Sequence, residues 1–353
     1  MNIIPAPQKI QRSADKPVIW SAFKLARITG LSPESFAQLR SEISLPWQLE
    51  MGSGFRVRLT KDRKVILEDV SVPDKPDAYI LRVTAQGIGI DANTSSGLWA
   101  GLQTLLQLIE AGPTIPACVI TDYAAIKLRA IHWDLKGFEP KFDNLLAQIR
   151  RLARLKYNVV ILELEDKYNY RSVPGAGIDG AYTFDQMRQL SQFAKAIGIN
   201  LVPKIQCIAH VDYLLKHPQF AHLRENNHPY QYCPRSDDVF NLWKAMAGEI
   251  IEAFAEHDTY FHIGADEADN LSQCQSCSPH SKPDNFLYHI HRCLDFIIAQ
   301  GRTPIMWDDM FRDPYNCLGE GGASQIWPLA QKAIINYWSY GYTGKNNVFP
   351  FLP

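Results

Sequence analysis

Short apolar runs separated by helical segments fill the chain from Leu128 onward, and they constrain the fold more than any other feature. This alternation is typical of repeated βα units that form a parallel sheet. The six runs are residues 128–134, 158–164, 200–206, 259–263, 304–307 and 333–337, with helices expected near residues 144–155 and 185–197. The pattern predicts an α/β fold with a (β/α)8 TIM-type barrel of which about six βα units are present.

Residues 1–123 have a different texture. Alternating apolar and polar residues predict strands at 55–59, 65–67, 78–83 and 88–92, and helical apolar spacing follows at 98–109. Such alternation indicates a sheet with one face in water. We expect a small α+β domain over residues 1–123 and a barrel-type domain over residues 124–353.

Polar and aromatic residues gather at the ends of the predicted strands. The loops at the carboxyl ends of barrel strands form the mouth of a (β/α)8 active site, so these residues are candidates for it. They are Arg129, Asp134, Asp166, His210, Asp266, Glu267, Trp307, Asp308 and Trp338. Acids together with aromatic rings suit a sugar, because pyranose C–H faces stack on rings and hydroxyls need charged partners.

Asp266 and Glu267 follow the apolar run 259–263 after a Gly-Ala pair. Neighbouring side chains of a strand point to opposite faces, so both acids serve one pocket only if the backbone turns at the strand's end. Gly264 and Ala265 make that turn inexpensive. The alternative is that Asp266 caps a following helix while Glu267 is solvated.

Charge and cysteine content restrict the class of partner and the compartment. With 36 basic and 37 acidic residues, nothing favours nucleic acid or an anionic membrane, and a small neutral ligand is expected. We found no run near the roughly 20 apolar residues of a membrane span. Seven cysteines fit reduced thiols better than a disulfide framework. We therefore expect a cytoplasmic protein, with an oligomeric state that the sequence leaves open.

Several segments resemble glycoside hydrolase family 20, the β-N-acetylhexosaminidases. The sequence His-Ile-Gly-Ala-Asp-Glu at residues 262–267 is similar to the family signature, in which a strand ends with a Gly and an Asp-Glu pair. Residues 132–137, 162–166, 220–225 and 307–310 look most like the hexosaminidase D branch. Residues 2–8 and 78–109 resemble the non-catalytic domain that precedes the barrel in this family.

This resemblance implies a substrate-assisted retaining mechanism. Glu267 is then the general acid, and Asp266 orients the 2-acetamido group of the substrate, whose own oxygen attacks the anomeric carbon. Burial beside Asp266 is expected to keep Glu267 protonated. No cofactor and no metal are needed. Terminal GlcNAc and GalNAc both remain possible substrates.

The resemblance also implies roles around the sugar. Arg129 resembles an arginine that grips sugar hydroxyls, and Asp166 with His210 resembles a supporting acid-histidine pair. Asp134 is a further substrate-binding candidate, Trp307 and Asp308 are expected to border the pocket, and Trp338 to wall its acetamido side. Ser339 departs from the D-type relatives, which tend to carry Asp there.

Two other functions remain open. The residues His132, Asp134, His210, His262 and Asp308 are possible ligands of a metal-dependent hydrolase on the same barrel. The second alternative is a degenerate barrel that binds amino sugars without cleaving them. Separately, Cys274, Cys277 and His280 have the spacing of zinc ligands, but a fourth ligand is unassigned, and free loop thiols are favoured.

The six predicted strands also bear on completeness. A closed barrel needs eight strands and typically about 250 residues. We therefore expect that the chain is the front portion of a longer enzyme.

Overall fold

The computed structural model describes residues 3–43, 45–62, 64–311, 318, 324 and 326–338. By their contacts the residues form two compact units. The first comprises Met1–Ile131, Pro140–Val160 and Gln189–Leu201, and the second His132–Glu139, Ile161–Arg188 and Val202–Pro353. The division therefore passes through the chain more than once, and the expected boundary at residue 123 stays a prediction.

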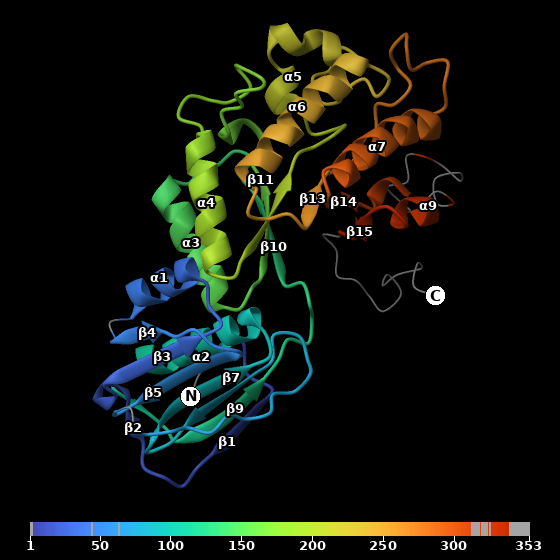
Figure 1. Cartoon of the computed structure of the whole chain (residues 1–353). Helices are drawn as coiled ribbons and strands as arrows, with labels where there is room; N and C mark the ends of the chain where they lie inside the picture. The colour runs from blue at the N-terminus through green and yellow to red at the C-terminus, as the bar shows by residue number, and fades with distance from the viewer. Residues whose placement is uncertain are drawn as a thin grey trace. The chain divides into compact units, whose positions relative to one another are not determined.

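The first unit contains a seven-stranded sheet in the order β1-β9-β6-β7-β5-β3-β4 (Figure 1). Its neighbours are antiparallel except β3 and β4, which are parallel. The strands are β1 (Lys9–Arg12), β3 (Leu25–Thr29), β4 (Trp47–Leu49), β5 (Phe55–Thr60), β6 (Tyr79–Val83), β7 (Gly87–Ala92) and β9 (Cys118–Asp122). A separate antiparallel pair joins β2 (Val18–Ile19) to β8 (Thr114–Ile115).

Helix α2 (Ser95–Glu110) packs on β5, β6 and β7, while α1 (Pro33–Glu42) contacts β4. The hydroxyl of Thr94 accepts a hydrogen bond from Gly97 N and so caps the first turn of α2. Most residues of α2 are buried, and the helix predicted at residues 98–109 is confirmed. The predicted strands at 55–59, 78–83 and 88–92 are confirmed as β5, β6 and β7.

The predicted strand at residues 65–67 is wrong. The carbonyl oxygens of Leu67 and Glu68 accept hydrogen bonds from the side chains of Arg58 and Arg82 instead of from a neighbouring strand. The guanidinium groups therefore satisfy two backbone carbonyl oxygens that would otherwise need N–H donors from a neighbouring strand.

The other sheet contains six strands in sequence order, β10-β11-β12-β13-β14-β15, and curves as a parallel half-barrel. The pairs β12–β13, β13–β14 and β14–β15 are parallel. The strands are β10 (Ala130–Asp134), β11 (Val159–Glu163), β12 (Asn200–Lys204), β13 (Tyr260–His262), β14 (Thr303–Trp307) and β15 (Ile334–Asn336). Each of the six apolar runs is thus confirmed as a strand, and the TIM-type fold is confirmed with it.

Helices connect successive strands of this sheet, as the alternating pattern predicted. They are α3 (Phe142–Arg154), α4 (Phe184–Ala196), α5 (Asp212–Leu215), α6 (Asp237–Ala253), α7 (Lys282–Ala299) and α9 (Ile326–Ala330), with short 3-10 turns η2 (Glu165–Lys167), η3 (Pro218–Leu223) and η4 (Asp309–Phe311). Ser236 and Ser281 accept hydrogen bonds from backbone N–H groups and cap α6 and α7. Helix α7 packs on α6 and on β14.

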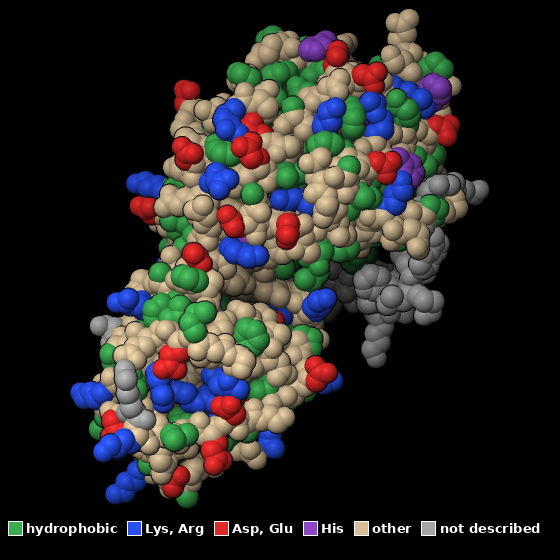
Figure 2. Space-filling model, viewed as in Figure 1, with side chains coloured by type: hydrophobic (Ala, Val, Ile, Leu, Met, Phe, Trp, Pro, Cys, Tyr) green, Lys and Arg blue, Asp and Glu red, His purple; other side chains and the backbone are tan. Residues whose placement is uncertain are grey.

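The surface carries mixed charge. On the face that Figure 2 shows, Lys and Arg side chains are interspersed with Asp and Glu. In the described part of the chain, no helix combines the length and the apolar character that crossing a bilayer requires.

Candidate active site

The backbone turns sharply directly after β13. Gly264, Ala265 and Glu267 have φ angles of 71°, 75° and 49°. Positive φ is unusual for residues other than glycine and is found where surrounding structure enforces it, often at functional sites. A Cβ on Gly264 would lie 1.8 Å from Gln206 Oε1, so this position requires glycine. The turn expected from the Gly-Ala pair is present.

The turn brings Asp266 and Glu267 to the same imidazole. His210 Nε2 lies 3.2 Å from Asp266 Oδ2 and 3.3 Å from Glu267 Oε2. Gln206 Nε2 donates to Asp266 Oδ1 at 3.0 Å. The hydroxyl of Tyr230 lies 3.1 Å from His210 Nε2 and donates to Glu267 Oε2 at 3.5 Å. Asp266 therefore does not cap a helix, and the next helix, α7, begins only at Lys282.

The protonation states of Asp266 and His210 support each other. Burial alone raises the pKa of Asp266, but the hydrogen bond to His210 and the charge of Lys204 outweigh it, and the pKa lies below its ordinary value. Burial lowers the pKa of His210, yet Asp266 outweighs that effect and the pKa is raised. An ionised Asp266 beside a cationic imidazole is therefore the favoured state. Glu267 is not buried as expected, because 40% of its side-chain surface is exposed.

A second cluster of polar and aromatic side chains is carried by the successive strands β10 to β14. Glu163 Oε2 is 2.7 Å from Lys204 Nζ and 3.1 Å from His132 Nε2. Burial alone would raise the pKa of Glu163, but Lys204 and His132 outweigh it and hold the pKa at about 2. The rings of His132 and His262 are stacked with centroids 6.4 Å apart, and the ring of Trp307 lies 4.7 Å from that of His262.

Asp309 fixes the backbone of the acid pair. Its Oδ2 accepts a hydrogen bond from Glu267 N at 2.9 Å, and its Oδ1 accepts one from Trp338 Nε1 at 3.1 Å. Burial raises its pKa to about 6. Asp308 Oδ1 accepts from Trp338 N at 3.4 Å. Both aspartates after β14 thus contact Trp338, and Asp309 connects it to Glu267.

Two predicted sugar-binding residues have partners that differ from those expected. Arg129 precedes the amino end of β10, where its guanidinium donates to Lys156 O at 2.7 Å and pairs with Asp77 at 2.6 Å. It therefore does not belong to the cluster at the carboxyl ends, and the prediction for Arg129 is corrected. Asp166 is not paired with His210, because its carboxylate is held by Lys167 and by Lys216 at 3.2 Å.

Asp134 stays a predicted site residue. Asp134 ends β10 with an exposed side chain whose Oδ1 accepts from Lys136 N at 2.8 Å. Ser339 lies outside the described residues. Sequence reasoning missed Gln206, Tyr230 and Asp309. The sequence could have indicated Asp309, because it is the second of two acids that directly follow a predicted strand. Tyr230 lies in a loop between η3 and α6, where no sequence pattern marks a site residue.

The five proposed metal ligands of the alternative hydrolase do not form one cluster. Over residues 3–311 and the later described positions, two groups of potential metal ligands occur, and neither includes His132, Asp134, His210, His262 or Asp308. His132 and His262 instead stack on each other, and His210 is engaged by Asp266 and Glu267.

A curved parallel sheet with adjacent carboxylates, a histidine and tryptophans at strand ends is the arrangement of a TIM-barrel glycoside hydrolase. Residues 124–344 match the family model described as glycosyl hydrolase family 20, catalytic domain. Residues 1–123 match the one described as glycosyl hydrolase family 20, domain 2. The chain belongs to glycosyl hydrolase family 20.

Individual relatives agree with this assignment. A beta-hexosaminidase of Porphyromonas gingivalis is 26% identical over an alignment of 391 positions, and the alignment covers 96% of this chain and 47% of the relative. Hexosaminidase D of Bos taurus is 28% identical over 225 residues, covering 61% of this chain and 63% of the relative. The chain thus spans about half to two thirds of these relatives.

Solved structures show the same fold. The exo-β-N-acetylglucosaminidase of Vibrio harveyi, in complex with N-acetylglucosamine, superimposes with a TM-score of 0.74 at 21% identity, covering 96% of this chain and 57% of that one.

Proposed function

We propose that the protein is an exo-β-N-acetylhexosaminidase that removes terminal β-linked GlcNAc or GalNAc residues with retention of configuration. The observation that carries this proposal is the contact of one imidazole, His210, with the adjacent carboxylates Asp266 and Glu267 at 3.2 Å and 3.3 Å. Membership of family 20 supports the same activity.

In the first step Glu267 protonates the glycosidic oxygen as the C–O bond to the leaving group breaks. The 2-acetamido oxygen of the substrate attacks the anomeric carbon and forms a bound oxazolinium ring, so no enzyme nucleophile is required. Asp266 accepts a hydrogen bond from the acetamido N–H and balances the positive charge on this ring. The low pKa of Asp266 supports this role, because the role needs an ionised carboxylate.

In the second step the Glu267 carboxylate takes a proton from water, and the water oxygen attacks the anomeric carbon and opens the ring. The exposed part of Glu267 suits this exchange with solvent. The hydrogen bond from Glu267 N to Asp309 keeps the backbone of the acid in place for both steps.

We assign the walls of the sugar site to Trp307, Asp308, Trp338 and Asp134. All four lie at or beyond the carboxyl ends of β10, β14 and β15, and Trp338 is joined to the acid pair through Asp309. Aromatic faces would stack on the pyranose and the acids would bind its hydroxyls. We do not assign Arg129 and Asp166 to these walls, because Arg129 pairs with Asp77 and Asp166 pairs with lysines.

We also propose how the chain divides into domains and in which cellular compartment the protein lies. We assign residues 1–123 to a non-catalytic domain and residues 124–353 to the catalytic domain, which the two family matches support. We place the protein in the cytoplasm. This placement is supported by the six described cysteines, all of which are free thiols. Three of them, Cys233, Cys274 and Cys277, lie close together without forming a disulfide.

Release of nitrophenol from paired β-glycosides of GlcNAc, GalNAc and glucose tests the activity. Turnover of either N-acetylated glycoside without turnover of the glucoside is the expected result, because the nucleophile is part of the acetamido group. Comparable turnover of the glucoside would refute substrate assistance. Binding of GlcNAc, measured by calorimetry, without turnover of any glycoside would instead identify a non-catalytic amino-sugar-binding protein.

A further inference from the structure

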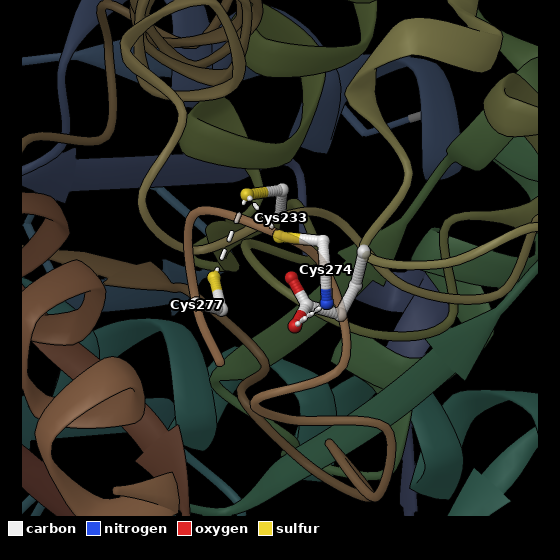
Figure 3. Close-up of side chains that lie close together, drawn as sticks. Cys233, Cys274 and Cys277 are labelled. Carbon is white, nitrogen blue, oxygen red and sulfur yellow. Dashed lines mark hydrogen bonds between the residues drawn. The ribbon is translucent and has the colours of Figure 1, made fainter. Parts of the chain in front are cut away.

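Three thiols and one carboxylate converge in the segments that follow β12 and β13 of the six-stranded sheet. The ligand atoms of Glu225, Cys233, Cys274 and Cys277 all lie within 4.8 Å of one another. Cys233 Sγ is 3.4 Å from Cys274 Sγ and 3.6 Å from Cys277 Sγ (Figure 3). A disulfide has a sulfur separation of about 2.05 Å, so these thiols are not bonded to one another.

The carboxylate of Glu225 has an unusual environment. The residue is 0% exposed, and its Oε1 accepts hydrogen bonds from Gln273 N at 2.7 Å and Cys274 N at 3.2 Å. Its Oε2 is buried and accepts no hydrogen bond from an N–H or O–H group of the described residues, and the thiols of Cys274 and Cys277 are its neighbours. A buried carboxylate oxygen without an N–H or O–H donor is costly, and a cation beside it removes that cost.

We propose that Glu225, Cys233, Cys274 and Cys277 bind one zinc ion in a closed, structural site. Two sulfurs that each bond a tetrahedral zinc ion at about 2.3 Å lie about 3.8 Å apart, and the observed separations of Cys233 from both other thiols need to grow only slightly. Glu225 Oε2 supplies the fourth ligand. Four protein ligands leave no open position for a substrate, so the ion stabilises structure and does not take part in glycoside cleavage.

The chemistry of the four ligands favours zinc over other cations. Thiolates are soft ligands that exclude calcium and magnesium, whereas a carboxylate is a poor partner for Cu(I). Zinc accepts both ligand types in tetrahedral geometry.

The sequence suggested a different third ligand. His280, which shares the zinc-like spacing with Cys274 and Cys277 in the sequence, is exposed and is not part of the cluster. Glu225 and Cys233 replace it. They lie on the segment after η3, more than 40 positions earlier in the chain, so local spacing did not reveal them.

The ion would join two loops of the candidate active site. Tyr230 lies between Glu225 and Cys233, and its hydroxyl contacts His210 and Glu267. Cys274 and Cys277 lie on the segment that continues from Glu267 towards α7. Asn270 N also donates to Gln231 Oε1 at 3.0 Å between the same segments. Zinc therefore holds Tyr230 in position beside the acid pair.

Metal content of the full chain, purified without chelator from zinc-supplemented medium, tests the site. Mass spectrometry with an inductively coupled plasma is expected to find about one zinc ion per chain. Cys233→Ser and Cys277→Ser are each expected to lower the zinc content to less than about a tenth of an ion per chain, because structural sites need all their thiolates.

Glu225→Gln retains an oxygen that can accept the two backbone hydrogen bonds but removes the anionic ligand, and it should bind zinc more weakly than the parent. Cys118→Ala, which removes a buried thiol on β9, is the matched control and should retain zinc.

A second measurement covers variants that fail to fold. The parent protein, stripped of metal, should bind Co²⁺ with a sulfur-to-cobalt charge-transfer band, and zinc should displace the cobalt and protect three thiols from alkylation. Absence of both zinc and the cobalt band in the parent would overturn the proposal. Equal zinc retention by Cys277→Ser and Cys118→Ala, or a disulfide at Cys233 in the native protein, would do so as well. None of these readouts depends on glycosidase activity.

Discussion

The imidazole of His210 lies 3.2 Å from the carboxylate of Asp266, and this contact favours the charged form of each group. It contributes to the lowered pKa of Asp266 and the raised pKa of His210. The backbone of His210 has a φ of 56°, so the loop after β12 is bent to present the ring. The arrangement keeps Asp266 ionised where the proposed mechanism needs a negative charge.

Replacing His210 should shift the pH dependence of the reaction. In His210→Asn, Asn tolerates the positive φ but supplies no cation, so the pKa of Asp266 should rise towards its ordinary value. The acid limb of kcat/KM against pH, measured on a nitrophenyl N-acetylglucosaminide, should therefore move to higher pH. His222→Asn changes an exposed histidine and serves as the control. An acid limb at the parental position in His210→Asn would contradict the pairing.

The same pair predicts how stability depends on pH. Asp266 has a lowered pKa in the folded state, so its contribution is present above the unfolded value of about 3.9 and is lost as pH falls through the folded value. His210 has a raised pKa, so its contribution is full below about 6.5 and is lost as pH rises through its folded value. Urea unfolding of the parent and of His210→Asn should show that the difference in free energy shrinks at both ends of the pH range. A difference independent of pH would contradict this.

Glu267→Gln should remove most activity on natural glycosides, because the amide keeps the shape of the side chain but cannot donate a proton. General acid catalysis contributes on the order of 10²–10⁴ in rate, so kcat on a chitobiose substrate should fall by that factor. Nitrophenyl glycosides have a better leaving group and should lose less. Glu256→Gln alters an exposed glutamate of the same type and should leave kcat unchanged. Parental activity of Glu267→Gln on chitobiose would rule out Glu267 as the acid.

Gly264→Ala should destabilise the protein and weaken the site. Alanine at a φ of 71° costs about 1–2 kcal/mol, and its Cβ would also collide with Gln206, which holds Asp266. Gly248→Ala is the matched control, because Gly248 lies in α6 with no atom within 4 Å of an added Cβ. That variant should gain about 0.5–1 kcal/mol from helix propensity. Equal unfolding free energies for the two variants would show that the turn does not require glycine.

Asp309→Asn should change how the stability of the protein depends on pH. Both carboxylate oxygens of Asp309 accept N–H groups, so the amide nitrogen of Asn must face one donor, at a cost of about 1–3 kcal/mol. In the parent, the pKa raised to about 6 means that the folded state binds the proton more tightly than the unfolded state. Stability of the parent should therefore decline as pH rises from about 4 to about 6, and Asn removes this decline. Asp179→Asn, at an exposed aspartate, should retain it.

Much of the fold was predictable because its signals are local. Each of the six strands of the parallel sheet coincides with an apolar run, and the inner strands β11 to β14 are mostly buried, which requires apolar side chains along their length. The turn at Gly264 and Ala265 was equally visible, because the conformational freedom of glycine belongs to the residue itself. The strand predicted at residues 65–67 was wrong because side chains of two other strands, Arg58 on β5 and Arg82 on β6, bind the carbonyl oxygens of Leu67 and Glu68.

Partners of charged side chains were decided only by the tertiary structure. The sequence by itself placed Asp266, Glu267 and His210 at strand ends, and these residues do meet. It could not show that Arg129 binds Asp77 or that Asp166 binds lysines, because side-chain direction depends on which loops pack together. The same reason applies to Glu225 and Cys233. Their meeting with Cys274 and Cys277 is produced by loop packing across more than 40 residues, and no periodicity along the chain encodes it.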